Sequence, residues 1–288
     1  MSDSQIKNLL IKAIIASQKA GKAILKVYES NQVFAGGVEY KPDNSPLTIA
    51  DKNAHTIIVN ELSGTKLPVL SEEGKDISYR DRKNWQYFWL VDPLDGTKEF
   101  IKRNGEFTVN IALIHDHKPV IGVIYEPVKD ILYFACKEMG AFKISEFGVR
   151  SSEFENVEEL ILKAESLPLA TKTTKFTIIA SRSHMSEQTQ AYINELQEEK
   201  GDIDIISAGS ALKLCLVAEG KADVYPRFAP TMEWDTAAGQ AIVEEAGGQV
   251  LMHESGEVML YNRENLVNGW FIVTRKKNYY SHKIKGNS

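Results

Sequence analysis

Apolar positions recur at helical spacing over residues 1–28. Ile6, Leu9 and Ala13 lie on one face of this segment, and lysines fall between the apolar positions. A period near 3.6 residues predicts an amphipathic helix. Residues 51–62 repeat the pattern and predict a second helix.

The next part of the chain consists of short apolar runs separated by turn residues. The runs occupy residues 87–91, 107–115, 119–125 and 131–136. Runs of this length and composition are typical of strands. Because their connections are short, we expect an antiparallel meander.

The pattern changes in the second half of the chain. Residues 146–174 are polar and irregular, and we place a domain boundary inside them. Beyond it the predicted strands lie at 176–180, 203–206, 222–225, 249–252 and 270–274, and the predicted helices at 186–199, 210–219 and 236–246. Alternation of this kind predicts an α/β domain at 151–288. It follows an α+β domain with an antiparallel sheet at 1–150.

The composition is that of an ordinary globular protein, with 43% hydrophobic and 25% charged residues. The longest stretch without Asp, Glu, Lys or Arg, 265–274, is too short to cross a membrane, and Lys12 interrupts the only apolar run that resembles a signal peptide. Cys136 and Cys215 form no metal-ligand motif, which predicts buried thiols in a reducing, cytoplasmic protein. A net charge of −5 disfavours a nucleic-acid polymer as partner.

One acidic motif is a candidate for chemistry. The segment Asp92-Pro93-Leu94-Asp95-Gly96-Thr97 directly follows an apolar strand. Its two carboxylates can converge on one point, and their oxygens are hard ligands that suit Mg²⁺ or Mn²⁺. Gly96 permits a close approach of the backbone to a ligand, and Thr97 adds a hydroxyl. An Asp-rich turn without any ligand explains the same residues.

Two further acidic segments change the balance toward a metal site. Glu72 and Glu73 follow the apolar residues 67–70, and Asp235 lies at the N-terminus of a helix rich in small residues. Taken singly, the acidic pair is explained by a solvated loop, and Asp235 by an N-cap.

Together, the Asp92–Thr97 motif, Glu72 upstream and Trp234-Asp235 downstream resemble the inositol monophosphatase superfamily over nearly the whole chain. The resemblance implies a layered αβαβα sandwich of the inositol monophosphatase and sugar phosphatase type. It also implies a magnesium-dependent, lithium-sensitive phosphomonoesterase.

The segments around the motif are similar to one branch of this superfamily, the CysQ-type 3'(2'),5'-bisphosphate nucleotidases. The similar segments are residues 96–100, 105–110, 180–184, 209–213 and 223–227. Enzymes of this branch remove the 3'-phosphate from adenosine 3',5'-bisphosphate to give AMP and phosphate. Some also act on the sulfated analogue, 3'-phosphoadenylyl sulfate.

The resemblance further implies two bound Mg²⁺ ions, for which Mn²⁺ can substitute. The implied ligands are Glu72, Asp92, the carbonyl oxygen of Leu94, Asp95 and Asp235, with Asp92 shared by both ions. A third, weaker ion is implied near Asp51 and Glu72. Two ions bring a charge of +4 to a cluster of carboxylates that would otherwise repel one another and a phosphate.

By the same resemblance, Asp51 orients Thr97, and Thr97 acts with Glu72 to activate the attacking water. The N–H groups of Gly96 and Thr97 would hold the scissile phosphate. Without the resemblance, Asp51 is simply an acid in the first turn of a helix, where the dipole favours it.

Residues of the second half are assigned to the rest of the substrate. The candidates are Ser181, His184, Ser210, Lys213, Arg227 and Asp235. Arg182, which lies between Ser181 and His184, is a weaker candidate than Lys213 or His184. Ser210 and Lys213 are expected in the first turns of a helix, which suits a 5'-phosphate. Arg227 follows a strand and suits stacking on adenine or binding of phosphate. Each of these residues, taken alone, has a simpler explanation as a surface or core position.

Three functions remain open to the sequence. A bisphosphate nucleotidase is favoured over an inositol monophosphatase or another sugar phosphatase by Lys98-Glu99-Phe100 and the segment 181–184. A non-catalytic nucleotide or metal sensor is disfavoured because Thr97 and all five carboxylates of the implied site are present. These are Asp51, Glu72, Asp92, Asp95 and Asp235. The expected partner is a small nucleotide bisphosphate. The sequence is compatible with a monomer or a homodimer, and with peripheral association with a membrane.

Overall fold

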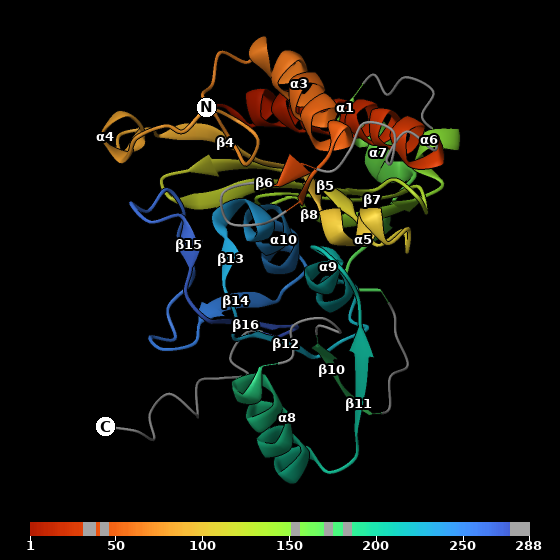
Figure 1. Ribbon diagram of the computed structural model, residues 1–288, viewed down its shortest axis with the longest axis vertical. Helices are drawn as coiled ribbons and strands as arrows, with labels where there is room; N and C mark the ends of the chain where they lie inside the picture. The colour runs from red at the N-terminus through yellow and green to blue at the C-terminus, as the bar shows by residue number, and fades with distance from the viewer. Residues whose placement is uncertain (31–38, 41–45, 151–155, 170–174, 181–185, 277–288) are drawn as a thin grey trace.

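Two large β-sheets and three layers of helices form the main body of the described chain (Figure 1). The computed structural model describes residues 1–30, 39–40, 46–150, 156–169, 175–180 and 186–276. Within these residues the layers follow one another in the order α, β, α, β, α along the longest axis.

The larger sheet has seven strands that lie side by side in sequence order. They are β3 (Val69–Ser71), β4 (Tyr87–Asp95), β5 (Thr108–His115), β6 (Lys118–Glu126), β7 (Ile131–Cys136), β8 (Gly140–Ser145) and β9 (Glu165–Ser166). β3 runs parallel to β4, and every other neighbouring pair is antiparallel. The predicted meander is therefore confirmed.

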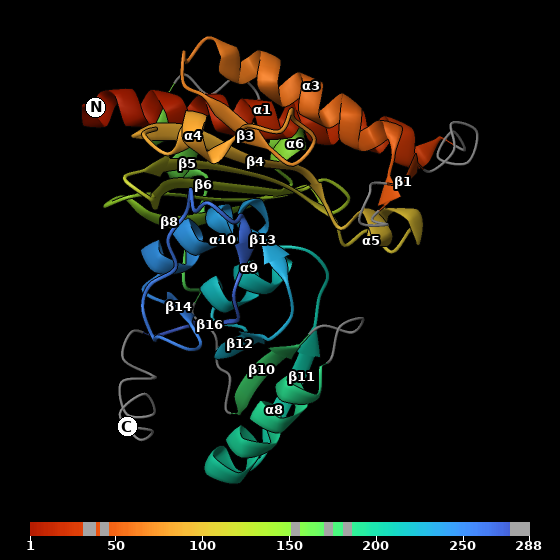
Figure 2. The ribbon, with the colours of Figure 1, turned by 60° about the vertical axis from the view of Figure 1, so that its left-hand side comes forward.

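Two long helices, α1 (Asp3–Glu29) and α3 (Ile49–Ser63), cover the outer face of this sheet (Figure 2). Ser2 caps α1 by accepting a hydrogen bond from the backbone N–H of Gln5, as an N-cap serine does. The apolar stripes of both helices are buried against β4, β5 and β6 in one continuous core. Burial of such a stripe supplies most of a helix's stability in a folded protein.

The opposite face of the large sheet is covered by α9 (Leu212–Ala218) and α10 (Glu233–Glu245). Gly122 on β6 allows the close approach of α10, because a Cβ at this position would lie 2.3 Å from the carbonyl oxygen of Ala238. A side chain here would therefore push the helix away from the sheet.

The smaller sheet packs on the other side of these two helices. Its strands, in spatial order, are β11 (Ile203–Ser207), β10 (Phe176–Ala180), β12 (Val224–Arg227), β16 (Phe271–Thr274) and β14 (Gln249–Met252). β10, β11 and β12 are mutually parallel, and β16 is antiparallel to both of its neighbours. α8 (Glu187–Lys200) covers the outer face and completes the fifth layer (Figure 2). The expected αβαβα sandwich is confirmed.

Short elements complete the described chain. They are β1 (Glu39–Tyr40), β2 (Pro46–Leu47), α4 (Tyr79–Arg82), α5 (Thr97–Ile101), α6 (Phe147–Arg150), α7 (Val157–Leu162), β13 (Thr231–Met232) and β15 (Val267–Asn268). The prediction of irregular structure over 146–174 was wrong for α6, α7 and β9. Asn156 caps α7, and Val157 and Leu160 are buried in the same core as α1. The division of the chain at residue 150 stays a prediction.

Two other sequence expectations concern the whole chain. Cys136 and Cys215 are both buried free thiols, so no disulfide joins them. Among the described residues, no helix has the length and apolar character needed to span a bilayer.

Candidate active site

The acidic motif lies where β4 departs from regular pairing. Asp92 pairs with Asn110 on β5, and Asp95 pairs with Thr108, so β4 contains one extra residue between these points. A bulge of this kind bends the strand and redirects its side chains. The strand thus continues through the motif to Asp95, whereas the sequence placed the strand end before Asp92.

Three carboxylates converge beside this bulge. Glu72 directly follows β3, Asp92 lies on β4 and Asp235 lies on α10; each offers an oxygen, and these oxygens all lie within 4.8 Å of one another. Such a set of oxygen donors fits Mg²⁺ or Mn²⁺. Leu94 and Asp95 lie on the same short segment, and both residues line the cavity above it.

Burial and mutual repulsion raise the pKa of Asp92, Asp95 and Asp235, so these three carboxyl groups stay protonated to higher pH than usual. Burial raises the pKa of Asp92 well above its ordinary value, and the charges of Glu72, Asp95 and Asp235 add to the shift. Burial likewise raises the pKa of Asp235, and that of Asp95 to about 6. A divalent cation bound here would reverse this effect by stabilising the ionised forms.

Asp235 is the third residue of α10, and its Oδ2 accepts a hydrogen bond of 2.8 Å from the backbone N–H of Met232. The sequence placed this helix at 236–246 with Asp235 as its N-cap. That start was wrong by three residues, because the buried carboxylate of Glu233 accepts hydrogen bonds from the N–H groups of Asn262 and Arg263 and anchors an earlier first turn.

Asp51 and Thr97 are in direct contact, although 46 residues separate them. The Thr97 hydroxyl donates to Oδ1 of Asp51 at 3.1 Å, while Oδ2 accepts from the N–H and the hydroxyl of Thr48 at 2.8 and 2.6 Å. Asp51 is 2% exposed, and burial raises the pKa of its carboxyl group against the effect of these hydrogen bonds. Asp51 is thus both the third residue of α3, which completes a capping box with the N-cap Thr48, and a fixed acceptor for Thr97.

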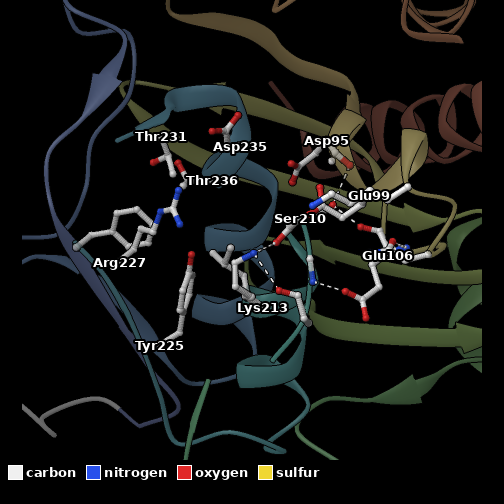
Figure 3. Close-up of a pocket in the computed structure, with 17 residues that line it drawn as sticks. Asp95, Glu99, Glu106, Ser210, Lys213, Tyr225, Arg227, Thr231, Asp235 and Thr236 are labelled. Carbon is white, nitrogen blue, oxygen red and sulfur yellow. Dashed lines mark hydrogen bonds between the residues drawn. The ribbon is translucent and has the colours of Figure 1, made fainter. Parts of the chain in front are cut away.

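Two adjoining cavities border the cluster. One, of about 480 Å³, lies over Glu72, Asp92 and Thr97. The other, of about 370 Å³, extends toward Lys213 and Arg227 (Figure 3). Both are lined by Asp95, Gly96, Glu99, Thr231 and Asp235.

Lys213 forms the floor of the second cavity. Its ammonium group donates to the carbonyl oxygen of Ser210 at 2.8 Å and to that of Ala208 at 3.4 Å (Figure 3). Lys213 is only 8% exposed, and burial lowers its pKa to about 8 despite the opposing charge of Asp95. Two of its three N–H donors are occupied by the protein, which leaves the third for a ligand.

Ser210 lies before α9 rather than inside it. The helix begins at Leu212, so the expectation that Ser210 occupies its first turn was wrong. The Ser210 hydroxyl lies 2.9 Å from the carbonyl oxygen of Asp95 and 2.7 Å from that of Glu106, and its one hydrogen can serve either. Its part in ligand binding stays a prediction.

The segment before α9 is therefore docked on the acidic motif. The N–H of Gly209 donates to Oε2 of Glu106 at 2.9 Å beside the Ser210 contacts. Gly96 has a φ of +94°, and a Cβ there would lie 2.2 Å from the Ser210 oxygen. Both the backbone conformation and the close contact require glycine at this position.

Arg227 ends β12 on the wall opposite Glu99 and Glu106 (Figure 3). Its Nη2 donates to the carbonyl oxygen of Pro230 at 3.2 Å, and its buried Nε has no hydrogen-bond partner among the described residues. Tyr225, on the same strand, lies beneath it and is 3% exposed. The cavity thus offers cationic donors on one side.

Sequence reasoning missed several residues of the site. Asn110 donates to Oδ2 of Asp95 at 3.3 Å and accepts a hydrogen bond from the Thr108 hydroxyl. Asn110 and Glu106 belong to the segment 105–110, which is similar to the bisphosphate nucleotidases, but the sequence alone indicates no role for either side chain. Three sequence candidates, Ser181, Arg182 and His184, lie outside the described residues.

The five-layer fold and the carboxylate cluster between its sheets define a layered α/β protein with a site suited to a divalent metal ion. Residues 6–282 match the inositol monophosphatase family. The chain belongs to this family.

Relatives in the family are similar over almost their full length. A 3'(2'),5'-bisphosphate nucleotidase CysQ of Salmonella typhimurium is 46% identical over 264 residues, which cover 90% of this chain and 96% of that protein. The crystal structure of CysQ from Bacteroides thetaiotaomicron has a TM-score of 0.87 and 51% identity, and the match covers 94% and 98% of the two chains. An IMPase of Thermotoga maritima, at 22% identity and a TM-score of 0.70, shares the fold; the match covers 93% of this chain and 92% of that one.

Proposed function

We propose that this protein is a 3'(2'),5'-bisphosphate nucleotidase that hydrolyses the 3'-phosphate of adenosine 3',5'-bisphosphate to AMP and phosphate. One observation carries the proposal: a cavity with the cationic side chains of Lys213 and Arg227 on one side adjoins the carboxylate cluster. A substrate with two separate phosphates can occupy both cavities, whereas an inositol monophosphate fills only one. The names of the relatives at 44–46% identity support the same activity.

The proposed cofactor is Mg²⁺, two ions per site, with Mn²⁺ as a substitute. Glu72, Asp92, Asp95, Asp235 and the Leu94 carbonyl are the proposed ligands. When bound, the ions would neutralise the phosphoryl oxygens and lower the pKa of a bound water. The high pKa values of the buried carboxyl groups support this assignment, because these groups lack enough cationic partners in the protein itself.

The chain's own residues would orient the attacking water. Because the Thr97 hydroxyl donates to Asp51, its oxygen can accept a hydrogen bond from the water. Glu72 would accept the second hydrogen. Attack on phosphorus forms the new P–O bond, the bond to the ribose 3'-oxygen breaks, and that oxygen takes up a proton.

The rest of the substrate would bind along the second cavity. We assign the scissile phosphate to the N–H groups of Gly96 and Thr97, and the 5'-phosphate to Lys213 and Arg227. Asp235 would border the ribose. Ser210, Ser181 and His184 remain candidates for further contacts. The free thiols of Cys136 and Cys215 are consistent with a protein that functions in the reducing cytoplasm.

The test is phosphate release from adenosine 3',5'-bisphosphate, 3'-phosphoadenylyl sulfate and inositol 1-phosphate, each with Mg²⁺, with a chelator, and with added lithium. We expect both nucleotides to be preferred by at least tenfold in kcat/KM, and activity to require the metal and to fall with lithium. Preference for inositol 1-phosphate would overturn the substrate assignment, and full activity in chelator would overturn the metal assignment.

A further inference from the structure

The junction of the two cavities is where the sugar of a bisphosphate substrate would lie. This inference rests on the proposed function, with the scissile phosphate over the carboxylate cluster and the second phosphate near Lys213. Of the five residues shared by the cavities, Asp95 and Asp235 belong to the acidic site and Gly96 has no side chain. Glu99 and Thr231 therefore supply the remaining side chains around the sugar.

Glu99 lies on α5, three residues after Gly96, and is half-buried. Its Oε2 is 3.4 Å from the point that a Cβ on Gly96 would occupy, and its Cγ is 3.1 Å from the corresponding point on Gly209. The carboxylate is thus held against the two glycine backbones that border the junction. Within the described part of the chain, it makes no hydrogen bond or ion pair.

The neighbouring polar groups are already engaged by the protein. Oε2 of Glu106 accepts the Gly209 N–H, and the Thr231 oxygen accepts a hydrogen bond from Asn268 at 3.0 Å. Figure 3 shows Glu99 on the wall opposite Arg227. At this wall, Glu99 is the carboxylate available to a ligand.

We propose that Glu99 is a specificity-determining residue that accepts a hydrogen bond from the ribose hydroxyl next to the scissile phosphate. An ionised carboxylate only accepts hydrogen bonds, so its partner must be a donor. Phosphate oxygens cannot fill this role, and they are repelled by the charge. The vicinal hydroxyl is the donor one carbon away from the scissile phosphate, which puts it at the junction.

The same contact is available to both isomers of the substrate. A ribose with its phosphate at the 3'-position has a free 2'-hydroxyl, and one with its phosphate at the 2'-position has a free 3'-hydroxyl. A deoxyribose has no such donor, and Glu99 would then be left without a partner beside the ligand. The enzyme is therefore expected to discriminate against 2'-deoxynucleotide 3'-phosphates.

The experiment compares adenosine 3',5'-bisphosphate with 2'-deoxyadenosine 3',5'-bisphosphate in the wild type, Glu99→Ala and Glu99→Gln. A hydrogen bond to a charged group predicts that the wild type prefers the ribonucleotide by roughly 10- to 100-fold in kcat/KM. Glu99→Ala should lose that factor on the ribonucleotide and less than about threefold on the deoxynucleotide. Glu99→Gln keeps an acceptor oxygen, so its kcat/KM on the ribonucleotide should lie between the values of the wild type and of Glu99→Ala. Glu198→Ala, on the exposed face of α8, is the charge-matched control.

Each outcome decides the proposal. Equal losses on both substrates in Glu99→Ala would overturn it and indicate a contact with another part of the nucleotide, such as the adenine amino group, or a structural role. Unchanged kinetics would also overturn it. A wild type that releases phosphate from neither nucleotide would refute the proposed function itself, which separates that failure from the failure of this inference.

Discussion

Asp95→Asn tests the electrostatic description of the carboxylate cluster in the metal-free protein. Asp95 is an acid whose pKa is higher in the folded protein, about 6, than its ordinary value of 3.8. The folded state therefore binds this proton more tightly than the unfolded state does. Its stabilising contribution is complete below about pH 4 and is lost as the pH rises through about 6.

The magnitude follows from the difference between the two pKa values. A shift of about 2 pKa units corresponds to about 3 kcal/mol at pH 8. Because one side of Asp95 faces a cavity open to water, and because Asn110 must adapt to the new amide, we reduce this to about 2 kcal/mol. In a chelator at pH 8, Asp95→Asn should be more stable than the wild type by this amount, which is about 4 °C in Tm.

The assay is thermal unfolding of both proteins in chelator from pH 4 to pH 8, repeated with Mg²⁺. The advantage of Asp95→Asn should vanish toward pH 4. With Mg²⁺ the order should reverse, because the wild type keeps a charged ligand that the variant lacks. A variant that is less stable than the wild type at every pH in chelator would refute the account of charge repulsion in this cluster.

Three further changes test other parts of the structure. In steady-state assays, Lys213→Ala should raise the KM for adenosine 3',5'-bisphosphate by roughly 10- to 100-fold and leave the KM for adenosine 3'-monophosphate unchanged. Equal changes in both KM values would show that Lys213 does not bind the second phosphate. Gly96→Ala should lower the free energy of unfolding by about 1–3 kcal/mol, with partial relief in combination with Ser210→Ala, since the new Cβ meets the Ser210 oxygen; no relief would argue against this contact. Glu219→Gln should lower the free energy of unfolding, measured with urea, by about 3 kcal/mol, because Lys143 loses its buried counter-ion. An unchanged urea midpoint would show that the Lys143–Glu219 ion pair contributes little to stability.

The helices and strands of the fold could be anticipated because periodicity reports which face of an element is buried, whereas the order of the layers followed only from the family resemblance. The meander from β4 to β7 was predicted from runs such as 107–115, which alternate with obvious turn residues. Boundaries were less accurate where a distant residue decides them. The start of α10 depends on the contact of Glu233 with Asn262 and Arg263, which local sequence does not reveal.

The acidic part of the candidate site could be anticipated from residue chemistry, whereas Lys213 and Arg227 were candidates only through the family resemblance. Carboxylates at strand ends are visible in a sequence, and the structure brings Glu72, Asp92 and Asp235 together. Asn110 was not assigned a role because an amide inside an apolar strand has no local signature; its importance comes from the neighbouring strand, where Asp95 lies. The position of Glu99 at the meeting point of two cavities is likewise a property of the assembled layers.

The docking of Ser210 on the carbonyl oxygens of Asp95 and Glu106 also bears on how the protein is made. More than a hundred residues of chain separate the acidic motif from Ser210, and Asp235 follows later still. During translation from the N-terminus, the motif leaves the ribosome long before the groups that complete it. The active site of a nascent chain would therefore be incomplete. Phosphatase activity would arise only after the segment with Ser210 and Asp235 had been synthesised and had packed against the acidic motif.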